Sequence, residues 1–207
     1  MQLLSMAHTP QEQKAIAVFR RSGGILRTGQ ALRAGVHRRN LYALREAGVL
    51  EHVSRGVYRL TGLPPLADPD LVTVATRVPR AVVALISALH VHGLTTEIPH
   101  EVSIALPRGT AQPRLDWPPL RVYRMSGAMF TSGIEIHSRD GVEIRVFGAA
   151  KSVADCFKFR SRVGVDVALE ALRTGFADRK FTPAQILRAA KLCRVAAVVR
   201  PYLEALQ

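Results

Sequence analysis

Cysteine and long hydrophobic runs are scarce in this sequence. It has two cysteines, Cys156 and Cys193, and neither shows the CxxC or His/Cys spacing of a zinc site. We expect both to be buried free thiols. No apolar run reaches membrane-spanning length, and no basic-then-apolar leader opens the chain. These absences predict a cytoplasmic protein that does not enter a membrane.

Signatures of nucleotide chemistry are also missing. Neither GxGxxG nor GxxxxGK followed by Ser or Thr occurs, which argues against Rossmann and P-loop phosphate sites. Residues 137–140 (HSRD) resemble part of a kinase catalytic loop, but its downstream asparagine, the glycine-rich loop and the DFG motif are absent. His90 and His92 would lie on different faces of a helix, which favours packed or helix-terminal histidines over metal ligands. We expect no catalytic residue, metal or cofactor.

Positive charge, by contrast, is abundant. Lysine and arginine number 29 against 16 acidic residues, and the net charge is +13. Residues 1–62 carry ten Lys/Arg against three Asp/Glu, and residues 63–207 carry nineteen against thirteen. Such an excess points to an anionic partner, for which nucleic acid is the usual example. The 48% hydrophobic content is enough for a core in one small and one medium domain.

The segment 27–60 has the pattern of a compact winged helix-turn-helix. Thr28 is placed to cap a short helix, and Gly35 supplies the turn that follows it. A second helix, at about 37–47, ends at Gly48, and the residues after it alternate as a β-hairpin. Two short helices, a tight turn and a hairpin together predict a DNA-binding domain.

The second helix of this pattern is the expected DNA-reading element. Leu41 and Leu44 would pack inward and leave a basic face outward. Arginine can form hydrogen bonds with guanine in the major groove, and Asn40 could pair with adenine. Arg55 would lie at the tip of the hairpin. The candidate DNA-binding residues are Thr28, His37, Arg38, Arg39, Asn40, Tyr42, Arg45 and Arg55. The alternative is an ordinary helix pair with a solvated charged face.

Glycine and proline in GLPPLADP (62–69) predict a linker between a winged-helix domain at 1–62 and a larger domain at 63–207. The fold class we expect is α+β: the N-terminal winged helix-turn-helix, then a mixed domain of a small β-sheet packed with helices, then a helical C-terminal part. The expected helices are 10–21, 70–76, 81–92 and four within 149–206, and the expected strands are 102–106, 120–123, 134–137 and 142–147.

Two further stretches, ALISALHVHGLTTEIPHEVSIALPRG (84–109) and FGAAKSVADCFKFRSRVGVDVALEALRTG (147–175), follow the winged-helix pattern. With these parts in this order, the chain resembles the AbiEi-type antitoxins, the repressor half of type IV bacterial toxin–antitoxin pairs, and the mycobacterial MenA antitoxins among them. In that family the N-terminal domain represses the antitoxin–toxin operon and the C-terminal domain counters a nucleotidyltransferase-like toxin. The resemblance therefore implies two partners, operator DNA with inverted repeats and a cognate toxin.

Four polar residues of the larger domain form a candidate antitoxin surface: Lys151, Asp155, Lys158 and Arg160. Lys151 and Asp155 are an i, i+4 pair on one helix face, and the other two extend a polar surface. The ordinary interpretation is an exposed salt bridge. The functional alternative is a basic docking surface for an acidic partner, and a phosphate-handling site is a third possibility.

Three functions remain open at the level of sequence. The first is an autorepressor and antitoxin that occupies its operator as a dimer or as cooperating monomers. The second is a plain winged-helix regulator with a ligand-binding or dimer-forming second domain and no toxin partner. The third is an enzyme-type antitoxin that modifies the toxin covalently, for example as a phosphotransferase.

Overall fold

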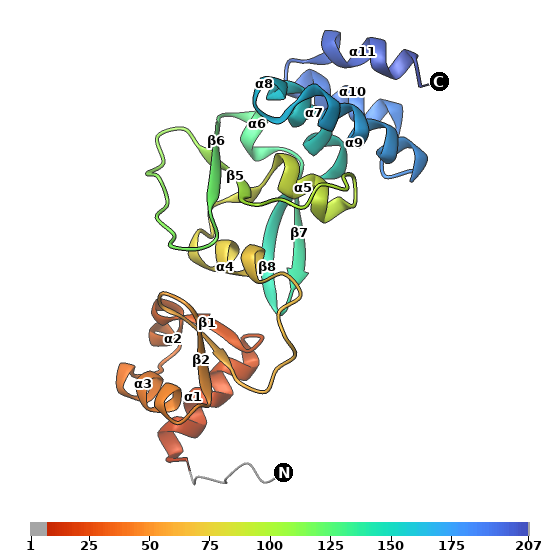
Figure 1. Ribbon diagram of the computed structural model, residues 1–207. Coiled ribbons are helices and arrows are strands. Elements are labelled where there is room, and N and C mark those ends of the chain that lie inside the picture. Colours follow the sequence, from red (N-terminus) through yellow and green to blue (C-terminus); the bar gives the residue numbers. More distant parts are fainter. Residues whose placement is uncertain (1–7, 207) are drawn as a thin grey trace. The chain divides into compact units, whose positions relative to one another are not determined.

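The computed structural model describes residues 8–206, which divide into two compact units. The first unit extends to Pro79 and includes Ser138–Glu143, and the second comprises Arg80–His137 and the residues from Ile144 onward. Both units combine helices with strands (Figure 1). The mixed α and β composition expected from the sequence is confirmed, whereas the domain boundary expected after residue 62 stays a prediction.

The first unit packs its helices against a small antiparallel sheet whose strand order is β1-β3-β2. Its elements are α1 (Pro10–Arg21), β1 (Ile25–Arg27), α2 (Thr28–Arg33), α3 (Arg38–Glu46), β2 (Leu50–Ser54), β3 (Val57–Leu60) and α4 (Pro69–Arg77). The hydrophobic core joins α1, α2, α3 and the sheet, and Phe19, Leu41 and Leu44 are almost completely buried in it. Each such side chain contributes roughly 1.5–3 kcal/mol on burial.

The ends of these helices follow local sequence signals. The Thr9 hydroxyl accepts from the backbone N–H of Glu12, whose carboxylate accepts from the N–H of Thr9, so a capping box begins α1. Gly35 and Gly48 adopt φ of +87° and +70°, and they end α2 and α3 as predicted.

The expected cap at Thr28 is wrong. Arg27 occupies the cap position of α2, and its N–H donates to the side chain of Gln30 at 2.9 Å. Thr28 is already helical, and its N–H and hydroxyl both donate to the carbonyl of Gly56, at 2.8 and 3.3 Å. Pairing of β1 with β3 keeps the chain extended up to Arg27, which the sequence pattern did not indicate.

The second unit contains most of a mixed five-stranded sheet and a group of helices (Figure 1). The strand order is β6-β5-β4-β8-β7; β5 runs antiparallel to β4, β8 runs parallel to β4, and β6 runs parallel to β5. Its strands are β4 (Val82–Val83), β5 (Val102–Pro107), β6 (Leu120–Met125), β7 (Ile134–Arg139) and β8 (Val142–Phe147). Its helices are α5 (Leu85–His92), α6 (Ala128–Thr131), α7 (Ala149–Lys158), α8 (Arg160–Val163), α9 (Val165–Ala177), α10 (Pro183–Leu192) and α11 (Ala196–Glu204).

The four predicted strands of this region are confirmed, but the helix predicted at 81–92 is partly wrong. Val82 and Val83 form β4 at the centre of the sheet, and α5 begins only at Leu85. A short apolar run is compatible with either a buried helix or a buried strand. Val82 and Val83 form a strand because they pair with β5 and β8. The tail has five helices rather than four because 160–163 form the short α8, and α11 continues through Pro201.

Helix α7 lies in the middle of the second core, where it contacts α5, α9 and α10. Cys156 and Cys193 are buried free thiols, as predicted, and burial raises the pKa of both. No helix within residues 8–206 is both long and apolar enough to cross a membrane.

Candidate nucleic-acid interface

Helix α3 has one buried face and one basic exposed face. Leu41 and Leu44 are 1% and 0% exposed and fix the helix on the core. Away from the core the exposed residues are Arg38, Arg39, Tyr42, Arg45 and Glu46, and Asn40 is half-buried. The guanidinium of Arg45 lies 3.8 Å from the carboxylate of Glu46. The predicted inward and outward faces are therefore confirmed. The structure brings these candidate residues together on a single helix.

His37 begins α3. Its Nδ1 atom accepts a hydrogen bond from the backbone N–H of Arg39 at 3.2 Å, so the imidazole caps the helix. This contact gives His37 a role in positioning the first turn, where Arg38 and Arg39 lie. Further along, the Arg45 guanidinium lies 5.5 Å from the centroid of the Tyr42 ring, which limits the freedom of both side chains.

The β2–β3 hairpin turns at Arg55 and Gly56, and Gly56 has a φ of +71° that suits glycine. Arg55 is exposed at this turn. Its backbone carbonyl accepts a hydrogen bond from Nη1 of Arg77, while the carbonyl of Gly56 accepts from Thr28. The turn is thus held from α4 and from α2. The half-buried Thr28 has this anchoring contact, and its contact with DNA stays a prediction.

A hollow of about 710 Å³ lies between α1 and the α2–α3 turn. Lys14 and Arg21 line it from α1, and Arg39 and Asn40 line it from α3. Lys14 and Arg21 were not among the residues predicted to bind DNA. Their seven-residue spacing places them on one side of α1, turned away from the side that the buried Ala15 and Phe19 occupy, and this periodicity could have indicated them.

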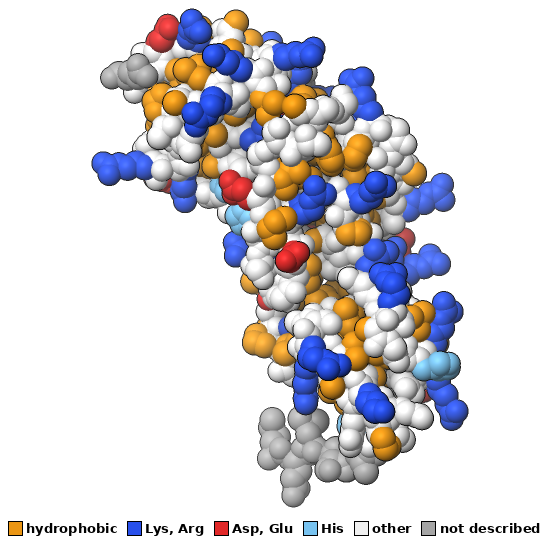
Figure 2. All heavy atoms as spheres, turned by 180° about the vertical axis from the view of Figure 1, so that it is seen from behind, with side chains coloured by type: hydrophobic (Ala, Val, Ile, Leu, Met, Phe, Trp, Pro, Cys, Tyr) orange, Lys and Arg blue, Asp and Glu red, His pale blue; other side chains and the backbone are white. Residues whose placement is uncertain are grey.

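The electrostatics of this unit favour an anion. Within residues 8–206, no carboxylate lies within 4.0 Å of a charged nitrogen of Arg38, Arg39 or Arg55. Arg59 differs, because it is buried and donates to Glu51 at 2.7 Å. On the face drawn in Figure 2, Lys and Arg side chains far outnumber those of Asp and Glu. The unpaired arginines are free to bind phosphates or base edges.

The predicted antitoxin surface needs correction, because two of its four residues are not at a surface. Lys151 is 4% exposed and Asp155 is 0% exposed. The Lys151 ammonium donates to Oδ1 of Asp155 at 2.7 Å, and the exposed salt bridge expected from the i, i+4 spacing is therefore a buried one. Spacing places two residues on one helix face, but it does not reveal which neighbours cover that face.

The buried pair has further partners in the core. The Cys193 thiol lies 3.1 Å from Oδ1 of Asp155, and the Lys151 ammonium lies 4.1 Å from the centroid of the Phe147 ring. Burial raises the pKa of Asp155, and the neighbouring Lys151 charge opposes that rise. A buried pair of this kind orders the core, but removing one partner leaves an uncompensated charge.

Lys158 and Arg160 are exposed, as predicted. They lie at the end of α7 and the start of α8, and Arg160 donates to the carbonyl of Phe157 at 2.9 Å. Arg162 is a third exposed cation in this short segment, and its guanidinium lies 6.0 Å from the centroid of the Tyr123 ring. Of the candidate surface only Lys158 and Arg160 remain, and with the exposed Arg162 they make a short basic segment.

Comparisons with known proteins bear on both units. Residues 13–61 match a family model described as transcriptional regulator, AbiEi antitoxin. Among solved structures, the chain is similar to the RV2827C protein from Mycobacterium tuberculosis, with 14% identity and a TM-score of 0.54 over 96% of this chain and 82% of that one. At this identity the likeness concerns the fold alone. No match was found among curated proteins. The matched residues extend from α1 to the end of the β2–β3 hairpin, so this part of the chain is similar to the AbiEi antitoxin transcriptional regulators.

Proposed function

We propose that this protein is an autorepressing antitoxin that binds operator DNA through a winged helix-turn-helix in its first unit. The observation that carries the proposal is the pair of exposed arginines at the start of α3, Arg38 and Arg39, which have no carboxylate partner among the described residues and lie in the segment that matches the AbiEi regulators. In such domains the N-terminal end of the recognition helix enters the major groove. Arg38 and Arg39 occupy that end of α3.

The arrangement of the other elements supports this use of α3. Helices α2 and α3 are joined by a glycine turn, and the β2–β3 hairpin follows directly, in the order of a helix-turn-helix with a wing. Arg55, which is exposed at the turn of the hairpin, would contact the phosphate backbone from the wing. Lys14 and Arg21 border the same hollow as the start of α3 and supply further phosphate contacts.

The second half of the proposal concerns the toxin. In the AbiEi family the C-terminal domain counters a nucleotidyltransferase-like toxin, and we assign that activity here to residues beyond the linker at 62–69. The short basic segment of Lys158, Arg160 and Arg162 is the proposed contact for an acidic surface of the toxin. Operator DNA with inverted repeats would be occupied by two copies, as a dimer or as cooperating monomers.

A gel-shift titration tests the DNA half. We expect Arg38→Ala combined with Arg39→Ala to weaken binding to the DNA upstream of the gene by about 30-fold or more, at roughly 1–3 kcal/mol per lost base contact. Circular dichroism should be unchanged because both side chains are exposed.

The matched control is Arg173→Ala combined with Arg200→Ala, which removes the same charge from exposed positions of the second unit. It should bind the upstream DNA like the unchanged protein. If the α3 variant keeps full affinity, or if the control loses as much, then α3 does not read the operator.

A further inference from the structure

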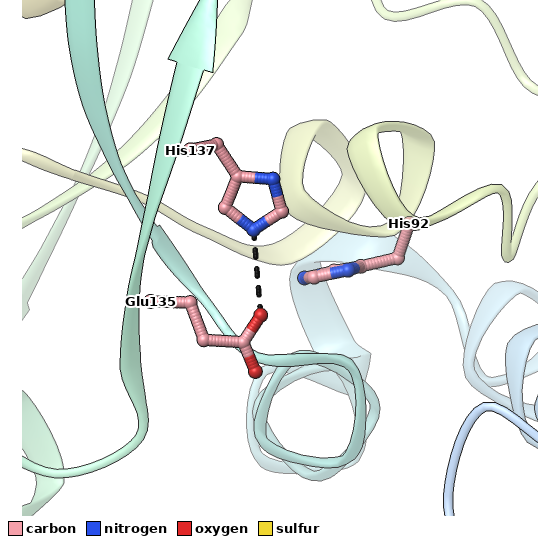
Figure 3. Close-up of side chains that lie close together, drawn as sticks. All are labelled: His92, Glu135 and His137. Atoms are coloured by element: carbon pink, nitrogen blue, oxygen red, sulfur yellow. Dashed lines mark hydrogen bonds and ion pairs between the residues drawn. The ribbon is translucent and has the colours of Figure 1, made fainter.

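Three side chains with metal-binding atoms meet in the second unit, away from α3. His92 is the last residue of α5, and Glu135 and His137 lie on β7. Because side chains alternate along a strand, Glu135 and His137 lie on the same side of β7. Figure 3 shows all three side chains directed into a common space. His92 is more than forty residues from Glu135 and His137 in the sequence, so no local sequence motif predicts that the three side chains meet.

The distances in this cluster are short. Nε2 of His137 lies 3.3 Å from Oε2 of Glu135, and the rings of His92 and His137 are in edge contact with centroids 5.5 Å apart. One ring nitrogen of each histidine and one carboxylate oxygen all lie within 4.8 Å of one another. Zinc ligands at about 2.0–2.2 Å from the ion lie roughly 3.4 Å apart. A small closing movement would complete the site, and the exposed Glu135 is free to make it.

His92 has the support that metal-binding histidines usually have. Its Nε2 atom lies 2.8 Å from the carbonyl of Phe147 at the end of β8 and donates to it. In that tautomer the lone pair that can bind a metal is on Nδ1, because a neutral imidazole has one donor and one acceptor nitrogen, so the His92 ring must present Nδ1 to the ion. A ligand histidine typically donates its other N–H to a carbonyl in this way.

We propose that His92, Glu135 and His137 bind one divalent transition-metal ion of the zinc class. Two imidazoles and one carboxylate form a known ligand set for such ions and leave one coordination position open. Nothing in the proposed DNA recognition requires this metal site, so the result of testing one proposal does not decide the other.

The surroundings of the cluster make it accessible and set its charge. Glu135 also lines a hollow of about 470 Å³, which gives an ion a route from solvent. The carboxylate of Glu135 favours a cation, and the ammonium of Lys180, whose charge also acts on His92, opposes one. Binding therefore depends on direct coordination by the three ligands rather than on a general negative field.

Metal titration of the full-length, untagged protein, first stripped with EDTA, tests the proposal. With zinc alone as the probe, calorimetry should give one ion per chain. His92→Ala, His137→Ala and Glu135→Gln should each weaken binding by about tenfold or more. Glu135→Gln changes an exposed side chain with little change of shape, so loss of folding would not obscure its result.

His90→Ala is the matched control, because His90 is exposed on the same helix and lies outside the cluster. It should bind zinc like the unchanged protein. Cobalt provides a second measurement and should give visible d–d bands without a thiolate charge-transfer band. The proposal is overturned if the unchanged protein takes up no ion, if the three variants bind as it does, if His90→Ala loses binding equally, or if a thiolate band appears.

Discussion

At the scale of single residues, Lys151 and Lys158 show how differently two lysines of one helix can be used. Both lie on α7, yet Lys151 is enclosed beside Asp155 in the core and Lys158 is exposed at the helix end. The energetic consequences differ accordingly. Removing the charge of Lys151 leaves the Asp155 carboxylate without a counter-charge in a low-dielectric environment. Removing the charge of Lys158 changes only a solvated part of the surface.

We therefore expect Lys151→Met to lower the free energy of unfolding by about 3–5 kcal/mol. Lys158→Met should change it by about 0.5 kcal/mol or less. Urea unfolding followed by circular dichroism measures both values. The double variant Lys151→Met, Asp155→Leu should be less destabilised than the sum of its single changes, because neither charge is then left alone. Equal and small effects of the two lysine changes would contradict the buried ion pair.

At the scale of elements, the β2–β3 hairpin and α3 are distinguished by what each can contact. Helix α3 presents several polar side chains suited to base edges, whereas the hairpin presents Arg55 at a turn fixed by Arg77 and Thr28. A single arginine on a fixed turn is suited to phosphates, which are the same in every sequence. The two elements should therefore differ in how they affect specificity.

Arg55→Ala should weaken binding to operator and unrelated DNA by similar factors. It should also reduce the slope of log affinity against log salt by about 0.9, the value for one phosphate contact. Fluorescence anisotropy titrations at several salt concentrations measure both quantities. A loss confined to the operator, with an unchanged slope, would show that Arg55 reads bases instead.

At the scale of the whole molecule, the two units have separate hydrophobic cores. The core of the first is built from residues between Ala15 and Leu60, and that of the second from residues between Val82 and Leu203. A unit with its own core can fold by itself. Arg77 adds a contact to the hairpin turn that a fragment ending at residue 62 would lack.

We expect a fragment of residues 1–79 to fold and to bind the upstream DNA, more weakly than the full chain because repressors usually bind as pairs. A fragment of residues 80–207 should not bind this DNA but should rescue cells that express the neighbouring toxin. Gel shifts and growth assays measure these outcomes. In the full chain, Lys158→Glu with Arg160→Glu should reduce rescue and leave DNA binding intact. If rescue requires residues 1–79, antitoxin activity does not belong to the second unit.

Local sequence signals by themselves determined most of the elements. The helix that begins at Pro10, the glycines at 35 and 48, and the alternation of the strands from Val102 onward each depend on a few neighbouring residues, and each is present where it was predicted. The inward and outward faces of α3 also follow from helical periodicity. The residues of α3 that we predict to bind DNA could be named for the same reason, because they are close together in the sequence, and their contact with DNA stays a prediction.

Only the tertiary structure decided which polar groups are covered and which distant residues meet. The spacing of Lys151 and Asp155 is the same for a surface pair and a buried one, and the packing of α5, α9 and α10 around α7 makes it buried. Val82 and Val83 became a strand because β5 and β8 lie beside them. His92 meets Glu135 and His137 for a similar reason, since long-range packing, rather than any local preference of the chain, brings the end of α5 to β7.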